Sequence, residues 1–183
     1  MDWQDDGIVL SSRKHGETSA VVTLLTRAHG RHAGLVRGGG GKRLSGTLQP
    51  GNAVRASWRA RLAEQLGTLT VEAGKPFAAM ALSDPRRLAA LSSACALVEA
   101  TLPEREPHAA LHDSLMVLLS TLDDDSVWPS LYVRWELGLL SELGFGLDLT
   151  VCAATGVTAE LTHVSPKSGR AVSAAAAKAA KER

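Results

Sequence analysis

An unbroken alternation of apolar and polar side chains over residues 52–62 narrows the possible folds of this chain more than any other feature. The apolar set is Val54, Ala56, Trp58, Ala60 and Leu62, and the intervening set is Arg55, Ser57, Arg59 and Arg61. Successive side chains of a β-strand point to opposite faces, so this period predicts a strand from Asn52 to Leu62. One face of that strand must be buried, and the other carries three arginines.

Four further stretches between residues 7 and 74 also predict short strands. They are Gly7–Ser12, Ser19–Thr26, Arg31–Arg37 and Thr68–Ala73, and all are rich in Val, Ile, Leu and Thr. The strings KHGET and AHG separate the first three and are typical of hairpin turns. Five short strands with a long loop after the third are typical of a small closed barrel such as the OB-fold. We therefore predict an OB-fold domain over residues 1–76.

The pattern becomes helical after Lys75-Pro76. Asp84 is a suitable N-cap with Pro85 at the first helical position, and apolar residues then recur at intervals of three and four, at Leu88, Leu91, Cys95, Val98 and Leu102. A second helix is predicted from Pro107 with Leu111, Leu115, Leu118 and Leu122 inward, a nearly all-apolar core helix over residues 126–144, and an alanine-rich helix over residues 171–183. The predicted fold class is α+β, with a helical domain over residues 77–183.

A basic, glycine-rich loop follows the third predicted strand. The four glycines Gly38–Gly41 lack Cβ atoms and permit close approach to a ligand, and Lys42 and Arg43 add two cations. Arg31 and Arg37 have even spacing, so a strand through both would point them to one face. This combination suits a phosphate-rich polymer better than a small molecule.

The loop has two alternative interpretations. A nucleotide-binding P-loop needs G-x-x-x-x-G-K-[ST], but with its lysine at Lys42 the first glycine falls on Val36 and the hydroxyl residue on Arg43. The P-loop is therefore disfavoured. A disordered, solvated linker remains an alternative.

The net charge of +1 conceals a strong asymmetry along the chain. Residues 13–61 carry ten Lys/Arg and one acid, whereas residues 76–149 carry four Lys/Arg and eleven Asp/Glu. The front of the chain therefore predicts a polyanion-binding face. The expected DNA-binding residues are Arg31, Arg37, Lys42, Arg43, Arg55, Arg59 and Arg61.

No catalytic or metal-binding constellation emerges from the sequence. His108 and His112 lack the glutamate of a metalloprotease helix and are interpreted as surface or capping residues, and Asp123–Asp125 as a solvated turn. Cys95 is expected to be a buried thiol. We expect a binding protein with no enzymatic activity, catalytic residue, metal or cofactor, while an RNA-binding OB-fold module and an enzyme of unrecognised type remain alternatives. Without a membrane-length apolar run or a secretory signal, we expect a cytoplasmic, nucleoid-associated protein.

Several long strings resemble the RecO family of DNA repair proteins, which are recombination mediators. They are GIVLSSRKHGETSAVVTLLTRAHGRHAGLVRGG, LQPG and LGTLTVE in the front half, and LPEREPH, YVRWELGLLSELGFGLDL, CAATG and VSPKSGRAVS in the back half. The resemblance implies an OB-fold followed by a helical domain, and binding and annealing of single- and double-stranded DNA. It also implies work with RecR and the single-strand DNA-binding protein, sometimes with RecF, and loading of RecA.

Three further expectations rest on this resemblance. Some members hold zinc through four cysteines after the third helix, but here only Cys152 is present, with His163 the nearest alternative ligand, so we expect no metal. The chain stops at AAKER, where members usually continue, so we expect a helical domain truncated at its C-terminus. Arg134, a cation on the third helix, is expected to receive the acidic tail of the single-strand DNA-binding protein.

Overall fold

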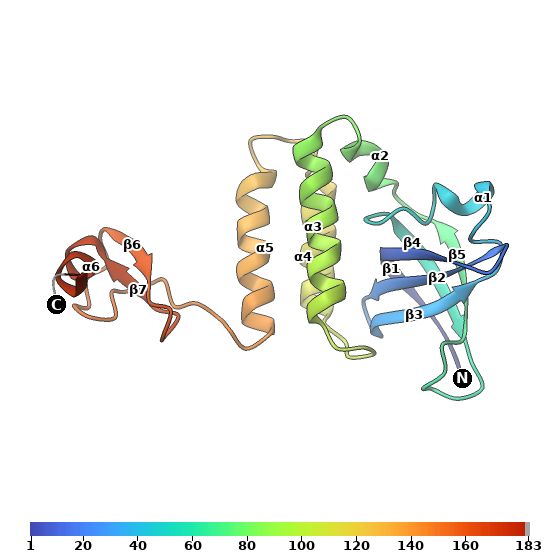
Figure 1. Ribbon diagram of the computed structural model, residues 1–183, viewed down its shortest axis with the longest axis horizontal. Coiled ribbons are helices and arrows are strands. Elements are labelled where there is room, and N and C mark those ends of the chain that lie inside the picture. The colour runs from blue at the N-terminus through green and yellow to red at the C-terminus, as the bar shows by residue number, and fades with distance from the viewer. Residues whose placement is uncertain (182–183) are drawn as a thin grey trace. The chain divides into compact units, whose positions relative to one another are not determined.

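The computed structural model describes residues 1–181 and contains a closed β-barrel followed by helices (Figure 1). This confirms the predicted α+β class and the N-terminal OB-fold barrel. Backbone contacts group residues 1–135 into one compact unit and the residues after Trp135 into a second. The division into an OB-fold domain over residues 1–76 and a helical domain over residues 77–183 stays a prediction. Among the described residues, no helix has the length and apolar character needed to cross a membrane.

The barrel has five strands in the order β1-β2-β3-β5-β4, closed by pairing of β4 with β1. Its strands are β1 (Asp2–His15), β2 (Ser19–Thr26), β3 (Gly30–Val36), β4 (Ala53–Arg59) and β5 (Thr68–Ala73). All neighbours are antiparallel except β3 and β5, which meet in parallel at Leu35 and Thr68. The short helix α1 (Lys42–Ser45) lies in the connection between β3 and β4.

Strand β1 is longer than the predicted Gly7–Ser12 because it pairs with two partners. Its first half pairs with β4 from Asp2 to Ile8, and its second half pairs with β2 from Gly7 to His15. The acidic start of the chain does not look like a strand by itself. Two of its three aspartates, Asp2 and Asp6, lie directly opposite arginines of β4. The local sequence pattern does not reveal this pairing.

The barrel core confirms most of the predicted face of β4. Val54, Ala56 and Trp58 are buried, together with Leu69 of β5. The strand ends at Arg59, and Leu62 is 45% exposed, so the prediction of an inward Leu62 is wrong. The indole Nε1 of Trp58 donates to the carbonyl of Leu66 at 2.9 Å, which ties the connection after β4 back to the core.

Helix α3 (Pro85–Thr101) begins as the sequence predicts. The Asp84 carboxylate accepts a hydrogen bond from the Arg86 backbone N–H at 2.7 Å, and Pro85 occupies the first turn. The helix packs against β1, and most of its predicted apolar stripe is buried, although Leu88 is exposed, contrary to prediction. The short helix α2 (Phe77–Ala81) precedes it.

Helix α4 (Ala109–Ser120) buries its predicted leucines and also two histidines. Leu111, Leu115, Leu118 and Leu122 are all buried. His108 and His112 are buried as well, so their interpretation as surface residues is wrong, but His108 does occupy the N-cap position of α4, as the alternative of a capping residue predicts. Helix α4 contacts β2, and His112 lies on the barrel side of the helix, where its Nδ1 is 3.0 Å from Asp113.

Helix α5 (Trp128–Glu142) is less buried than its composition predicts. Trp135 and Leu139 are buried, but Val133 is 55% exposed and Leu140 is also exposed. The predicted core helix is thus only partly buried within the described residues, and the expectation of an incompletely covered helical domain stays a prediction.

The second compact unit contains a two-stranded sheet and a short helix. Strand β6 (Leu161–Val164) pairs with β7 (Ala171–Ser173), and helix α6 covers Ala174–Lys181. Residues 171–173 were predicted as helix but form β7, because they pair with β6. The part of the predicted helix at residues 182–183 lies outside the described residues.

Candidate nucleic-acid interface

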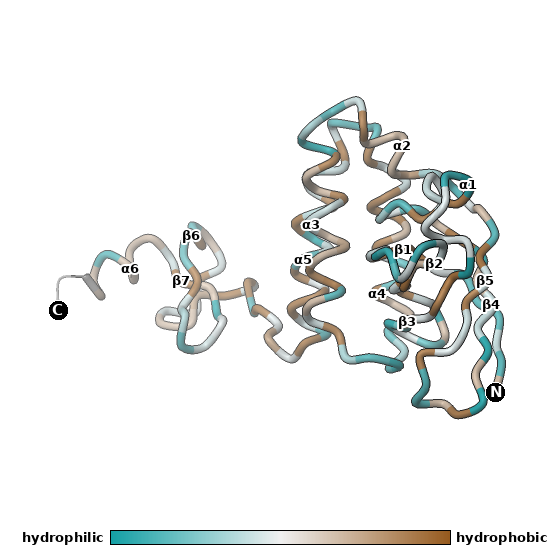
Figure 2. The backbone as a smooth tube through the Cα atoms, turned by 45° about the vertical axis from the view of Figure 1, so that its right-hand side comes forward, coloured by the Kyte–Doolittle hydropathy of each residue, from teal (hydrophilic) through white to brown (hydrophobic). Residues whose placement is uncertain are grey.

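The glycine-rich loop is an ordered turn that leads into α1. The backbone N–H of Gly40 donates to the carbonyl of Thr18 at 2.9 Å, and that of Gly41 donates to Gly38 at 3.0 Å. Gly38 has φ +74°, a conformation that favours glycine. The loop is thereby fixed against the β1–β2 turn, which excludes the alternative of a disordered linker. α1 has the hydrophilic colour in Figure 2.

Four exposed cations gather around this turn, and we call them the loop-end cluster: Lys14, Arg37, Lys42 and Arg43. Lys14 and Arg37 belong to the same end of the barrel because Lys14 pairs with Ala20, which pairs with Val36. A groove of about 210 Å³ lies between the hairpin and the loop, lined in part by Lys14, Gly39 and Gly40. Within residues 1–181, no member of the cluster forms an ion pair.

Lys14 is the member that the sequence analysis missed. It belongs to the KHGET string, which indicates a hairpin turn but not a ligand contact. Its position beside the glycine-rich loop depends on the pairing of β1 with β2 and of β2 with β3. The adjacent string RKH was the available signal, since basic residues beside a tight turn are often exposed.

The arginines of β4 are placed differently, because acids of β1 face them. Asp6 is directly opposite Arg55 and Asp2 is directly opposite Arg59 in the strand register. Ion pairs join them, at 2.9 Å for Arg55–Asp6 and 3.4 Å for Arg59–Asp2. Each such exposed pair is worth about 0.2–1 kcal/mol, so the pairing is weak but reduces the positive field of this face.

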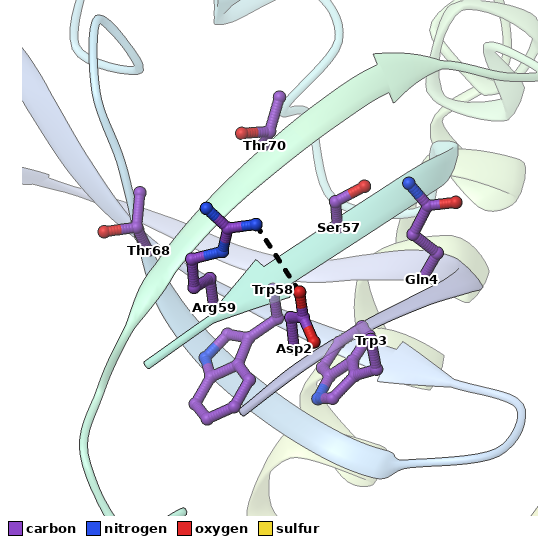
Figure 3. A pocket seen from close by; sticks show the side chains of 8 residues that line it. All are labelled: Asp2, Trp3, Gln4, Ser57, Trp58, Arg59, Thr68 and Thr70. Atoms are coloured by element: carbon purple, nitrogen blue, oxygen red, sulfur yellow. Dashed lines mark hydrogen bonds and ion pairs between the residues drawn. The ribbon is translucent and has the colours of Figure 1, made fainter. Parts of the chain in front are cut away.

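A groove of about 640 Å³ lies on the outer face of β1, β4 and β5. Figure 3 shows Gln4, Ser57 and Thr70 on one side of the sheet, whereas the indoles of Trp3 and Trp58 lie on the other side. The groove therefore offers amide and hydroxyl groups for hydrogen bonding. Trp3 and Trp58 also line the groove, but their rings pack against each other and against His32.

Arg31 faces the helical part of the same unit. Its Nε donates to the carbonyl of Leu102 at 2.8 Å, and its Nη1 lies 3.4 Å from Glu104. The side chain is only 19% exposed. The geometry gives Arg31 a structural role in joining β3 to the connection between α3 and α4. Arg61, by contrast, is exposed on the β4–β5 loop.

Helix α3 packs against β1, and a groove of about 510 Å³ lies between it and the face of β2 and β3, which OB-folds commonly use for oligonucleotides. That common surface comprises the face of the second and third strands and the loops β1–β2 and β4–β5. Here Val21 and Thr23 of β2 face Ala96 and Glu99 of α3, and Ser11 donates to Glu99 at 2.6 Å. The two loops remain open, and the loop-end cluster and Arg61 lie at them.

A packed aromatic cluster closes the barrel at the other end. Trp3 stacks on His29 with ring centroids 4.3 Å apart, and His32 contacts Trp3 and Trp58 edge-on at 5.0 and 4.8 Å. His32 is 4% exposed, and neither ring nitrogen has a hydrogen-bond partner among the described residues. Burial, with a smaller contribution from the charge of Arg105, lowers the pKa of His32 to about 4. His32 is therefore neutral at neutral pH.

The two cysteines differ in chemistry. Burial raises the pKa of Cys95 to about 12, which makes it an inert core thiol. Hydrogen bonds from Thr155 and Ser173 lower the pKa of Cys152 to about 6. Within residues 1–181, no three His, Cys, Asp or Glu side chains come close enough to hold a metal ion, and His163 contacts Thr162 instead. These residues do not fit the four-cysteine zinc site of some family members.

Arg134 is exposed on α5 next to the exposed Val133. It forms no ion pair within residues 1–181. A cation beside an apolar side chain can contact an acidic peptide that also carries apolar residues.

Comparison with known proteins identifies the family. A family model described as "Recombination protein O N terminal" matches residues 1–77, and one described as "Recombination protein O C terminal" matches residues 82–183. The DNA repair protein RecO of Rhodospirillum centenum is 59% identical over 185 residues, which cover 100% of this chain and 74% of the relative. The chain belongs to the RecO family of DNA repair proteins. The RecO of a Ruegeria species is 52% identical over 177 residues, covering 97% of this chain and 73% of the relative.

Membership of the RecO family agrees with the architecture. The N-terminal match covers the whole barrel, and the C-terminal match begins after α2, ahead of α3. The resemblance on which the family was first identified is thereby confirmed.

Proposed function

We propose that this RecO family protein binds single- and double-stranded DNA through the loop-end cluster and Arg61, and promotes annealing of DNA strands. The observation that carries the proposal is the group of four exposed cations, which form no ion pair among the described residues, at the end of the barrel where the β1–β2 and glycine-rich loops meet. Phosphate groups supply the complementary charge. The protein acts without catalysis, in the cytoplasm at the nucleoid.

Recognition in this proposal is mainly electrostatic. Contacts to phosphates position a protein on nucleic acid without reading its sequence. Base stacking would add affinity, but Trp3 and Trp58 are packed in the aromatic cluster with His32. We therefore expect weak sequence preference and strong dependence on salt. Arg55 and Arg59 contribute secondary contacts, since phosphates must compete with Asp2 and Asp6 for them.

The salt dependence of binding to a single-stranded oligonucleotide tests the proposal. About four phosphate contacts give a slope of log affinity against log salt near −2.8, at about −0.7 for each contact on single strands. Lys42→Gln/Arg43→Gln should make the slope shallower by about 1.4 by the same relation. Arg55→Gln/Arg59→Gln removes the same charge from the same barrel and serves as the matched control with a smaller effect.

Two results would contradict this assignment. Binding that does not depend on salt would exclude a phosphate-binding surface. A larger loss in the β4 control than in the Lys42/Arg43 variant would move the primary contact to the outer face of β4. Competition with an RNA strand of the same sequence separates DNA binding from an RNA-binding OB-fold function, which would show preference for the RNA.

We also propose that the protein assists RecA loading together with RecR and the single-strand DNA-binding protein, and in some settings with RecF. Arg134 would contact the acidic tail of the single-strand DNA-binding protein, supported by its exposure beside Val133 on α5. Arg134→Glu should weaken binding of a tail peptide, measured by fluorescence anisotropy. Lys178→Glu, an equal charge change elsewhere on the chain, is the control. Equal affinities for the two variants would exclude Arg134 from the contact.

A further inference from the structure

The β4–β5 loop, residues 60–67, is exposed but held in one conformation. It carries Arg61 and two exposed leucines, Leu62 and Leu66, and it belongs to no helix or strand. Inside the loop, the Gln65 backbone N–H donates to the Leu62 carbonyl at 3.3 Å, and the Gln65 side chain accepts from the Leu62 N–H at 3.3 Å. Near the end of the loop, the indole Nε1 of Trp58 donates a hydrogen bond to the Leu66 carbonyl.

A single side chain from outside the barrel fixes the middle of this loop. Arg105, in the connection between α3 and α4, donates from Nη1 to the Ala63 carbonyl and from Nη2 to the Gln65 carbonyl, the latter at 3.0 Å. The planar guanidinium presents its donors as a rigid fork, so it can hold both carbonyls at once. An ammonium group is a compact point charge and cannot reproduce that geometry.

The connection that carries Arg105 is itself fixed to the barrel. The Arg105 backbone N–H donates to the Arg31 carbonyl at 2.8 Å, and the Arg31 side chain returns a bond to the Leu102 carbonyl. Arg105 has φ +63°, a left-handed conformation that L-residues rarely adopt. Gly30 lies so close to the connection that an added Cβ would sit 1.8 Å from the Glu106 carbonyl oxygen. The contacts between the connection and β3 therefore fix Arg105, and Arg105 in turn fixes the β4–β5 loop.

We propose that Arg105 is a positioning residue for nucleic-acid binding: it holds the β4–β5 loop in a binding-ready conformation, so that the helical segment controls a DNA contact of the barrel. This inference rests on the proposed function. Ordering a flexible loop at the moment of binding lowers affinity, and a loop fixed beforehand avoids that loss. The fixed loop presents Arg61 to phosphate and Leu62 and Leu66 to the bases.

A double-mutant cycle on the full chain separates positioning from a direct contact. Arg105→Lys keeps the positive charge and loses the fork, and it should weaken binding of a single-stranded oligonucleotide roughly three- to tenfold. Arg61→Ala should weaken binding in the wild type but have a clearly smaller effect in the Arg105→Lys background. If Arg105 were only a phosphate contact, lysine would replace it and the Arg61 effect would persist.

Hydrogen exchange without DNA supplies a second readout. Backbone amides of residues 60–67 should exchange faster in Arg105→Lys, with the amides of β2 and β3 unchanged. Arg87→Lys is the matched control, because Arg87 also bonds a backbone carbonyl, that of Asp123, at 3.0 Å away from the loop. It should alter neither the loop exchange nor the affinity.

The outcomes distinguish this inference from the proposed function. A wild-type chain that fails to bind DNA overturns the proposed function and with it this inference. If the wild-type chain binds DNA, two results overturn only the role of Arg105. One is an unchanged affinity in Arg105→Lys, and the other is additive effects of Arg61→Ala and Arg105→Lys on the affinity. Arg105→Gln, which keeps a hydrogen-bond donor without the charge, is combined with Arg61→Ala in the same way. Additive effects of these two substitutions on DNA affinity would also overturn the positioning role of Arg105.

Discussion

Acidification from pH 7 to pH 4 should destabilise the barrel through His32. The imidazole is buried between Trp3 and Trp58, and its two ring nitrogens have no hydrogen-bond partner within residues 1–181. The charges that act on it are Arg105 and His29, which disfavour protonation, and Glu104, which favours it. Protonation in the folded state therefore places a charge in an apolar cluster without a partner.

The size of the effect follows from the pKa of His32. The pKa falls from 6.5 to about 4 in the folded protein. Between these two values the unfolded chain binds a proton that the folded chain does not, so the free energy of unfolding falls as the pH is lowered. A gap of about 2.5 pKa units corresponds to a loss of roughly 3 kcal/mol, complete near pH 4 and level below it.

Urea unfolding at intervals from pH 7 to pH 4 measures this loss, with His32→Phe as the comparison. Phenylalanine fills the aromatic cluster but cannot be protonated, so its profile should be flatter by roughly 3 kcal/mol over this range. Asp84 and Asp113 have pKa values lowered to about 2, so their stabilising effect is lost mainly below this window. Identical slopes for the wild type and His32→Phe would refute the reasoning.

Two further substitutions test the ion pairs and the close approach at the barrel end. Asp2→Asn/Asp6→Asn removes the ion-pair partners of Arg59 and Arg55, so the slope of log affinity against log salt for single strands should steepen by up to about 1.4. The control Asp148→Asn breaks an exposed ion pair in the second unit and should leave this slope unchanged. Gly30→Ala should lower the free energy of unfolding by roughly 2 kcal/mol or more, because the added Cβ would meet a backbone carbonyl. The control Gly16→Ala has a similar φ but open space around it, so it should lower the free energy of unfolding by only about 1 kcal/mol. Equal losses for the two glycine variants in urea unfolding would mean that the steric contact is relieved without cost.

Local patterns predicted the barrel because each strand carries its own signal. The alternation along β4 and the caps of α3 depend on neighbouring residues, and both appear in the structure. The extension of β1 to Asp2 could not be predicted, because its polar residues become a strand only beside β4. The burial of His112 was missed for a similar reason, since it depends on the packing of α4 against β2.

The candidate site shows the same limit. Even spacing placed Arg31 on the outer face of its strand, but the connection between α3 and α4 occupies that position and bonds its guanidinium. The arginines of β4 point outward as predicted, yet the acids opposite them come from a segment far away in the sequence. Lys42 and Arg43 are exposed, as their place in the loop predicts, and their contact with DNA stays a prediction.

The double pairing of β1 also fixes the order in which the barrel can assemble. Its second half finds β2 across a short turn, but its first half must wait for β4, since the Asp6–Arg55 contact spans 49 residues. Closure is therefore the non-local, slow event of folding, after the local hairpins form. Until then residues 2–8 present an unpaired strand edge, and edges of this kind attract other chains. The aspartates on that edge discourage such pairing during synthesis, so the acids that later face Arg55 and Arg59 also protect the unfinished barrel from aggregation.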